Sequence, residues 1–282
     1  MLDYLKSSPF YFLPHHLISW LVFHIARIKW TPVKKLSLDV YLSLHEVNMA
    51  EAVESNPYAY ENLNAFFTRA LKNDARPLAE GNNTFLCPVD GTVSQAQAIS
   101  NGRVFQAKKH DYSLLELVGG IEQLARPFEN GTFATLYLSP RDYHRIHMPL
   151  AGKLTDMVYV PGRLFSVAPH TVNTVPRLFA RNERLVCAFD TEAGPMIMIL
   201  VGAINVSAID TVWAGSVTPP SKNKIIHTRY DSVDIQLDKG AEMGRFNLGS
   251  TVIMLMGENI QLDEQIKTDN TVRMGQALAT YN

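Results

Sequence analysis

A glycine followed by two hydroxyl side chains has the most specific chemical potential in the sequence. Gly249, Ser250 and Thr251 stand directly before the apolar run 252–256, which predicts a buried strand. Because glycine adopts backbone angles closed to other residues, the Gly249–Ser250 peptide could be held under strain. A deprotonated Ser250 oxygen could then attack the Gly249 carbonyl and turn the amide into an ester. Taken alone, the triplet is better explained as an ordinary β-turn before a strand, because Gly and Ser are common in turns.

A segment rich in ionisable side chains could supply the base. Residues 138–149 contain two histidines three positions apart, His144 and His147, among two arginines and an aspartate. Histidine is the side chain best suited to move protons near neutral pH. A polar surface loop is one alternative interpretation. A zinc site built from the two histidines and Asp90 is another, although the neighbouring arginines oppose a dication.

Asp90, His147 and Ser250 together could form a nucleophilic set. A serine becomes a good nucleophile only when a base lies within hydrogen-bond reach and a third group orients that base. The order Asp, His, Ser along the chain is compatible with such a triad. Asp90 also precedes Gly91 between two apolar segments, a pattern typical of a hairpin turn.

A non-catalytic carrier domain is a third interpretation. Lys239, between Asp238 and Gly240, resembles the exposed lysine turn of lipoyl-type domains, although a solvated turn lysine is the simpler explanation. Intact-mass measurement separates the possibilities, because self-cleavage gives two fragments, lipoylation adds mass and a zinc hydrolase shows neither change.

The elements around these residues predict an α+β fold with a mostly antiparallel β core and peripheral helices. From residue 84 onward, short apolar segments alternate with Gly and Pro. The segments 84–89 and 92–99 predict a hairpin around Asp90. No linker divides the chain further, so we expect residues 36–282 to form one catalytic domain. Further strands are expected at 133–138, 153–160, 185–190, 196–201, 206–213, 233–237 and 252–256.

Residues 1–35 are expected to form a membrane-surface helical segment. The apolar stretch 17–28 has one thin polar edge, and its helix would rise about 18 Å, too short for a hydrocarbon core of about 30 Å. Five basic residues against one acidic residue in 1–35 favour an anionic surface. A core helix of a soluble domain is the alternative.

Composition narrows the choice of partners. The formal net charge of −1 and the pI of about 6.8 argue against a nucleic-acid binder. The two cysteines, Cys87 and Cys187, provide neither a disulfide framework nor a metal-binding spacing.

Four motifs in the right order resemble those of phosphatidylserine decarboxylases of the bacterial, membrane-associated, pyruvoyl-dependent type. The motifs are LGST at 248–251, YLSPRDYHRIHMP at 137–149, VPGRLFSV at 160–167 and LFARNER at 178–184. The resemblance extends from the N-terminal helix to the last strand.

The resemblance implies that the chain cleaves itself between Gly249 and Ser250. The products would be a β chain of residues 1–249 and an α chain of residues 250–282 that begins with a pyruvoyl group made from Ser250. Asp90, His147 and Ser250 would form the cleavage triad, with His147 as the base, and His144 would act in decarboxylation. The pyruvoyl carbonyl would serve as the electron sink, without a metal.

The resemblance also implies the substrate and the cellular setting. The enzyme would convert phosphatidylserine to phosphatidylethanolamine and CO₂. It would be a homodimer of αβ units, peripheral on the cytoplasmic face of the inner membrane. Because extracting a diacyl lipid costs about 0.8 kcal/mol per CH₂ group, an interfacial N-terminal helix suits this substrate. The candidates for substrate binding are Arg141, Arg145, Arg163, Tyr137 and Ser166.

Overall fold

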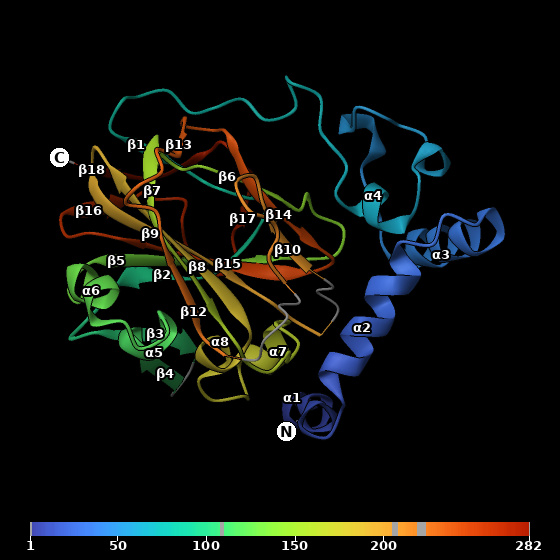
Figure 1. The fold of residues 1–282 in the computed structure, drawn as a ribbon, viewed down its shortest axis with the longest axis horizontal. Helices are drawn as coiled ribbons and strands as arrows, with labels where there is room; N and C mark the ends of the chain where they lie inside the picture. The colour runs from blue at the N-terminus through green and yellow to red at the C-terminus, as the bar shows by residue number, and fades with distance from the viewer. Residues whose placement is uncertain (1, 108–109, 205–207, 219–223, 282) are drawn as a thin grey trace.

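The computed structural model describes residues 2–107, 110–204, 208–218 and 224–281. It confirms the α+β class, because every strand-to-strand pairing in the described part is antiparallel and the helices lie outside the sheets (Figure 1).

A nine-stranded sheet forms the core, in the order β12-β7-β8-β9-β15-β5-β2-β17, with β13 also paired to β7. The strand β15 lies at its centre, and all seven of its residues are buried. Its apolar run therefore packs on both faces, as predicted. The strands are β2 (Gly91–Ala98), β5 (Thr132–Leu138), β7 (Gly152–Val160), β8 (Arg184–Thr191), β9 (Gly194–Val201), β12 (Ile226–Arg229), β13 (Gln236–Leu237), β15 (Ser250–Met256) and β17 (Thr271–Val272).

Three smaller sheets complete the β structure. A four-stranded sheet has the order β11-β10-β14-β6, a three-stranded sheet has the order β1-β18-β16, and β3 pairs with β4. Their strands are β1 (Thr84–Leu86), β3 (Arg103–Ala107), β4 (His110–Ser113), β6 (Arg145–His147), β10 (Ala208–Thr211), β11 (Gly215–Ser216), β14 (Glu242–Asn247), β16 (Ile260–Leu262) and β18 (Ala277–Tyr281).

The hairpin predicted around Asp90 is wrong. The strand β1 pairs with β18, whereas β2 pairs with β5 and β17. The Asp-Gly step therefore carries the chain from one sheet to another. Long-range partners compete successfully with the local turn because each strand buries more apolar surface in its own sheet.

The helices α1–α3 form an N-terminal arm, residues 2–44, and apart from α2 and α3 in this arm the helices are short. Figure 1 shows α1–α3 (blue) along one side of the β structure, with α4 between this arm and the sheets. The predicted helix at 17–28 is present as α2, while α3 runs through residue 35, so the predicted segment boundary falls inside a helix. The helices are α1 (Leu2–Ser7), α2 (His15–Ala26), α3 (Thr31–Leu44), α4 (Leu63–Phe67), α5 (Leu114–Leu117), α6 (Glu122–Ala125), α7 (Pro169–Val172) and α8 (Leu178–Arg181), with 3-10 turns η1 (Ser8–Tyr11), η2 (Met49–Glu51), η3 (Pro57–Ala59) and η4 (Arg126–Phe128).

Two connections face each other where the nine-stranded and four-stranded sheets meet. Residues 139–144 join β5 to β6, and residues 248–249 join β14 to β15. The two connections are joined by a contact at each end. Leu138 pairs with Ser250 in the nine-stranded sheet, and the Phe246 amide donates to the His144 carbonyl at 3.1 Å beside the four-stranded sheet. The two motifs singled out in the sequence are therefore brought opposite one another.

Candidate active site

The predicted cleavage point lies in a left-handed turn. Leu248 and Gly249 have φ values of 85° and 51°. A non-glycine residue in this region costs roughly 1–2 kcal/mol, because Cβ crowds the following carbonyl oxygen. Ser250 is fully buried, and its Oγ has no hydrogen-bond partner among the described residues. A buried hydroxyl that lacks a described partner and follows a strained Leu248 is a feature that function, rather than stability, would retain.

His144 directly precedes β6, at the end of the β14–β6 ladder that lies next to this turn. The residue is fully buried, and its Nδ1 lies 2.9 Å from the Asp142 carbonyl oxygen. Nδ1 must therefore carry the hydrogen, which leaves the Nε2 lone pair without a partner in the described chain. Burial lowers the pKa of His144 to about 3, so the ring is neutral at neutral pH. Its tautomer suits it to accept a proton at Nε2.

His147 lies farther along the same ladder. His147 pairs with Glu242 and lies three residues beyond His144 in the chain. At about 3.4 Å per residue, its backbone is about 10 Å farther from the turn than that of His144. Its Nδ1 contacts the Gly240 carbonyl at 2.8 Å and its Nε2 contacts the Tyr143 hydroxyl at 2.9 Å. Burial lowers the pKa of His147 as well. Both of its ring nitrogens are thus already hydrogen-bonded, and neither contacts Ser250.

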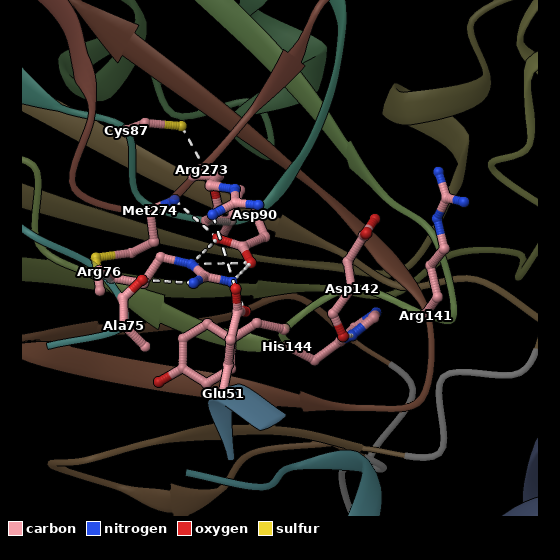
Figure 2. A network of polar contacts seen from close by, with 12 residues as sticks. Glu51, Ala75, Arg76, Cys87, Asp90, Arg141, Asp142, His144, Arg273 and Met274 are labelled. Atoms are coloured by element: carbon pink, nitrogen blue, oxygen red, sulfur yellow. Dashed lines mark hydrogen bonds and ion pairs between the residues drawn. The ribbon is translucent and has the colours of Figure 1, made fainter. Parts of the chain in front are cut away.

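Asp90 is held in a buried ionic network (Figure 2). Its carboxylate accepts two hydrogen bonds from Arg76 Nε, at 2.9 and 3.1 Å, and one from the Met274 amide at 2.9 Å. Arg76 also donates to Glu51 at 2.8 Å, so one guanidinium joins two carboxylates. Among the described residues, neither His147 nor Ser250 is a hydrogen-bond partner of Asp90.

Strand register nevertheless places Asp90 at the same sheet edge as the cleavage turn. Thr92, Tyr137 and Thr251 lie in one row across β2, β5 and β15. Asp90 and Gly249 directly precede β2 and β15, which flank β5, so they lie about 10 Å apart at two strand spacings. The His147 amide also donates to the Pro88 carbonyl at 2.9 Å, which ties β6 to the same segment.

Residues that the sequence did not single out hold these connections from outside. The Tyr41 hydroxyl of α3 donates to the Pro140 carbonyl, and Arg69 donates to the Arg141 and Asp142 carbonyls. The centroid of the Phe67 ring of α4 lies 4.1 Å from the centroid of the His144 ring. No local pattern marks these residues, because their partners are about 70 or more positions away in the chain.

The five predicted substrate-binding residues do not converge on one pocket. Arg141 lines a cavity of about 180 Å³ with Asp90 and Arg76, whereas Tyr137 lines another of about 350 Å³. The remaining three have partners elsewhere. Arg145 contacts Glu242 and the Thr68 carbonyl, Arg163 donates to the Tyr11 carbonyl, and the Ser166 hydroxyl accepts from the Ala168 amide.

The structure also bears on the two rival interpretations. In the described part of the chain, no group of three or more His, Cys, Asp or Glu side chains could hold a metal ion. The Lys239 ammonium donates to the Gly81 carbonyl at 2.8 Å, so this lysine is tied to a neighbouring segment.

A serine hydroxyl that is buried behind a left-handed Leu-Gly step, with no partner among the described residues, suits attack of a chain on its own backbone, as in the class of self-cleaving proenzymes. The family model described as phosphatidylserine decarboxylase matches residues 63–280, and a second, described as PSD, matches residues 5–38. The chain belongs to the phosphatidylserine decarboxylase family.

Full-length relatives agree with this membership. The chain is 55% identical over 273 residues to the phosphatidylserine decarboxylase proenzyme of Pseudomonas entomophila (strain L48), a match that covers 95% of each chain. It is equally identical to the corresponding proenzyme of Pseudomonas aeruginosa (strain LESB58), over 95% of this chain and 94% of the relative.

Family membership confirms several predictions made from the sequence. The chain is a carboxy-lyase of phospholipid biosynthesis, it is made as a proenzyme that cleaves itself into an α and a β chain, and its cofactor is a pyruvoyl group. Bacterial members of the family are membrane-associated. None of the described helices is both long and apolar enough to cross a bilayer.

Proposed function

We propose that Ser250 is the nucleophile of self-cleavage and the source of the pyruvoyl group that decarboxylates phosphatidylserine. The observation that carries this assignment is the Ser250 hydroxyl itself, which is fully buried, unpartnered among the described residues and preceded by two left-handed residues. These residues fit a pyruvoyl group at position 250, because the hydroxyl is not used in folding and Gly249 tolerates the required backbone angles.

The proposed cleavage conserves atoms at each step. The Ser250 Oγ forms a bond to the Gly249 carbonyl carbon, the C–N bond breaks, and the nitrogen takes up a proton to become an amine. Loss of the Ser250 α-proton then expels the Gly249 carboxylate and leaves a dehydroalanine. Water replaces the nitrogen, ammonia leaves, and a ketone remains at the start of the α chain.

The base that takes the Ser250 proton is one of two histidines. The family resemblance assigns this role to His147 with Asp90. The hydrogen bonds favour His144, because its Nε2 is unpartnered in the described chain and it lies nearer to the turn, whereas His147 Nε2 already accepts from Tyr143. We keep both assignments, since single variants distinguish them.

For the decarboxylation we assign the proton-transferring role to His144. The pyruvoyl carbonyl supplies the electron sink for loss of CO₂ from the serine headgroup. The Nε2 of His144 would hold or move the proton that the former α-carbon receives, and Phe67 keeps this ring away from water. Arg141, on the rim of the cavity beside Asp90, is the best-placed candidate for the lipid phosphate.

The N-terminal arm suits an enzyme that works on a lipid surface. Large apolar side chains are exposed along α1–α3, and the same arm carries the positive charge of residues 1–35. We infer that the arm lies in the cytoplasmic face of the inner membrane and that residues 36–282, which begin inside α3, form the catalytic part. The exposed side chains include Leu5, Phe12, Leu17, Trp20, Leu21, Ile25, Trp30, Leu36, Val40 and Leu44.

A homodimer of αβ units remains a proposal that rests on the family resemblance. Light scattering of the detergent-solubilised, matured protein would test it, and a mass of one αβ unit would contradict it.

Intact-mass spectrometry tests the nucleophile. We expect wild type to give fragments 1–249 and 250–282, with the second blocked by a pyruvoyl group, and Ser250→Ala to remain one inactive chain. Fragments from Ser250→Ala, or a free amine at residue 250 in active wild-type enzyme, would exclude this assignment.

The same measurement separates the two histidines. If His144 is the base, His144→Ala will accumulate precursor while His147→Ala still matures. If His147 is the base, the pattern will be reversed, and matured His144→Ala will lack only decarboxylase activity.

A further inference from the structure

The last residue of β14 is fixed by a set of side-chain hydrogen bonds. Asn247 is 1% exposed and directly precedes the left-handed Leu248–Gly249 step. Its Nδ2 donates to the Ala208 carbonyl at 3.2 Å and to Asp210 Oδ2 at 2.9 Å. Its Oδ1 accepts from Asn64 Nδ2 at 2.8 Å.

These contacts leave the Asn247 amide only one orientation. Two acceptors, a carbonyl and a carboxylate, lie on its Nδ2 side, so turning the amide over would place its oxygen against both of them. The oxygen must therefore face α4, where a donor is required. Asn64 supplies that donor from a position 183 residues away in the chain.

A second contact from α4 acts on the next residue. Phe67 and Leu248 belong to one small buried cluster with Ala26 of α2. Because Phe67 also lies against the His144 ring, α4 contacts both the turn that precedes Ser250 and the histidine opposite it. The first residue of the turn is thus packed at its side chain, while the residue before it is hydrogen-bonded.

We propose that Asn64 is a positioning residue for self-cleavage, acting through Asn247 to hold the Leu248–Gly249 step in its left-handed conformation. The proposal rests on the assignment of Gly249–Ser250 as the cleavage site. If the end of β14 were free, the turn could relax to an unstrained conformation, and the Gly249 carbonyl would move away from the Ser250 oxygen. Once the peptide is cut, this strain no longer exists. Asn64 should therefore affect maturation and not turnover.

Asn64→Asp is the sharpest variant, because it keeps the shape of the side chain and removes its donor. Asn62→Ala is the matched control. Asn62 caps the same helix by accepting from the Ala65 amide at 2.8 Å, and it makes no hydrogen bond to Asn247 among those described. The two variants thus separate loss of the contact to Asn247 from a general loosening of α4.

Pulse-labelled cell-free synthesis followed by denaturing electrophoresis would measure the rate at which precursor becomes two chains. We expect Asn64→Asp to mature at least about tenfold more slowly than wild type, because the Asn247 oxygen loses this donor and faces a carboxylate instead, and Asn62→Ala to stay within about threefold. Decarboxylase activity per mole of pyruvoyl should be unchanged in both. Thermal midpoints in the Ser250→Ala background should fall no further for Asn64→Asp than for Asn62→Ala.

Wild-type maturation of Asn64→Asp, or equal slowing by Asn62→Ala, would overturn the positioning role. Reduced turnover per pyruvoyl would do the same, since it would place Asn64 in the decarboxylation. If wild type itself gave no fragments ending at 249 and 250, the cleavage-site assignment would be the part that fails.

Discussion

Burial of a neutral imidazole is the most consequential feature at the scale of single residues. An unfolded chain binds a proton on His144 near pH 6.5, whereas the folded chain keeps this ring neutral until about pH 3. The unfolded state therefore binds more protons below pH 6.5. Stability from this residue is complete above that pH and is lost as the pH falls towards 3.

This difference predicts a pH-dependent stability that one substitution removes. When the pH is lowered from 7 to 5.5, the unfolding free energy should fall less in His144→Gln than in the chain that keeps His144. We expect the difference to be about 1 kcal/mol, since one proton is worth up to about 1.4 kcal/mol per pH unit. Urea titrations in the Ser250→Ala background, where no cleavage interferes, provide the measurement. Identical pH dependence in the two chains would show that His144 already titrates normally in the folded protein.

The Arg76–Asp90 pair is a second residue-scale feature, and it has a matched control. Arg76 and Asp90 have side chains 7% and 11% exposed, whereas Arg103 and Asp111 form a similar pair at 49% and 50%. We expect Arg76→Gln to lower the unfolding free energy by about 3–5 kcal/mol, because a buried carboxylate loses its partner. Arg103→Gln should cost about 0–1 kcal/mol.

Urea unfolding of both variants would test the comparison, again in the Ser250→Ala background. Equal effects of the two substitutions would mean that the buried Arg76–Asp90 pair contributes no more to stability than the exposed one. In that case the network of Figure 2 would be incidental to the site.

At the scale of elements, the position of β15 explains how a cut chain can remain a working enzyme. Ser250 begins the central strand of the nine-stranded sheet, with β9 and β5 paired along its length. The proposed cleavage before Ser250 would remove one covalent bond and leave both ladders in place. The C-terminal strand β18 is also held, between β1 and β16.

The two chains should therefore stay associated after maturation. In gel filtration without denaturant we expect fragments 1–249 and 250–282 to elute together, and to separate only in urea or guanidinium concentrations that unfold the sheet. Release of the short chain under native conditions would mean that the ladders around β15 do not survive the cut.

At the scale of the whole molecule, exposed apolar side chains are concentrated on the N-terminal arm. Phe12 is 89% exposed there, while Val233, on a loop of the β structure, is 49% exposed. A surface of this kind on one side of the protein favours docking onto a bilayer. The same arm ends in α3 and is followed by α4, which contact the catalytic connections.

Phe12→Glu should therefore weaken binding to vesicles that contain anionic lipid, while Val233→Glu should not. Sedimentation with such vesicles measures the bound fraction, and we expect at least about a fivefold loss for Phe12→Glu, since burying a large apolar side chain is worth about 1.5–3 kcal/mol. Equal binding of the two variants would place the membrane contact elsewhere on the protein.

The sequence alone was sufficient for the features that depend on local pattern. A continuous apolar run predicted the buried strand at 252–256, helical periodicity predicted the helix at 17–28, and the order of four motifs predicted the family. These features can be predicted from the sequence because residues close together in the chain determine them. The Gly249–Ser250 cleavage assignment belongs to the same reasoning and remains a prediction.

Only the tertiary structure decided which distant residues meet in the region around that step. Arg76 on Asp90, Asn64 on Asn247 and Phe67 on His144 are pairings made across sheets and helices. The replacement of the predicted hairpin by separate pairings of β1 and β2 has the same origin. The physical reason is that burial and long-range hydrogen bonding, which no local spacing records, outweigh turn preference when the core closes.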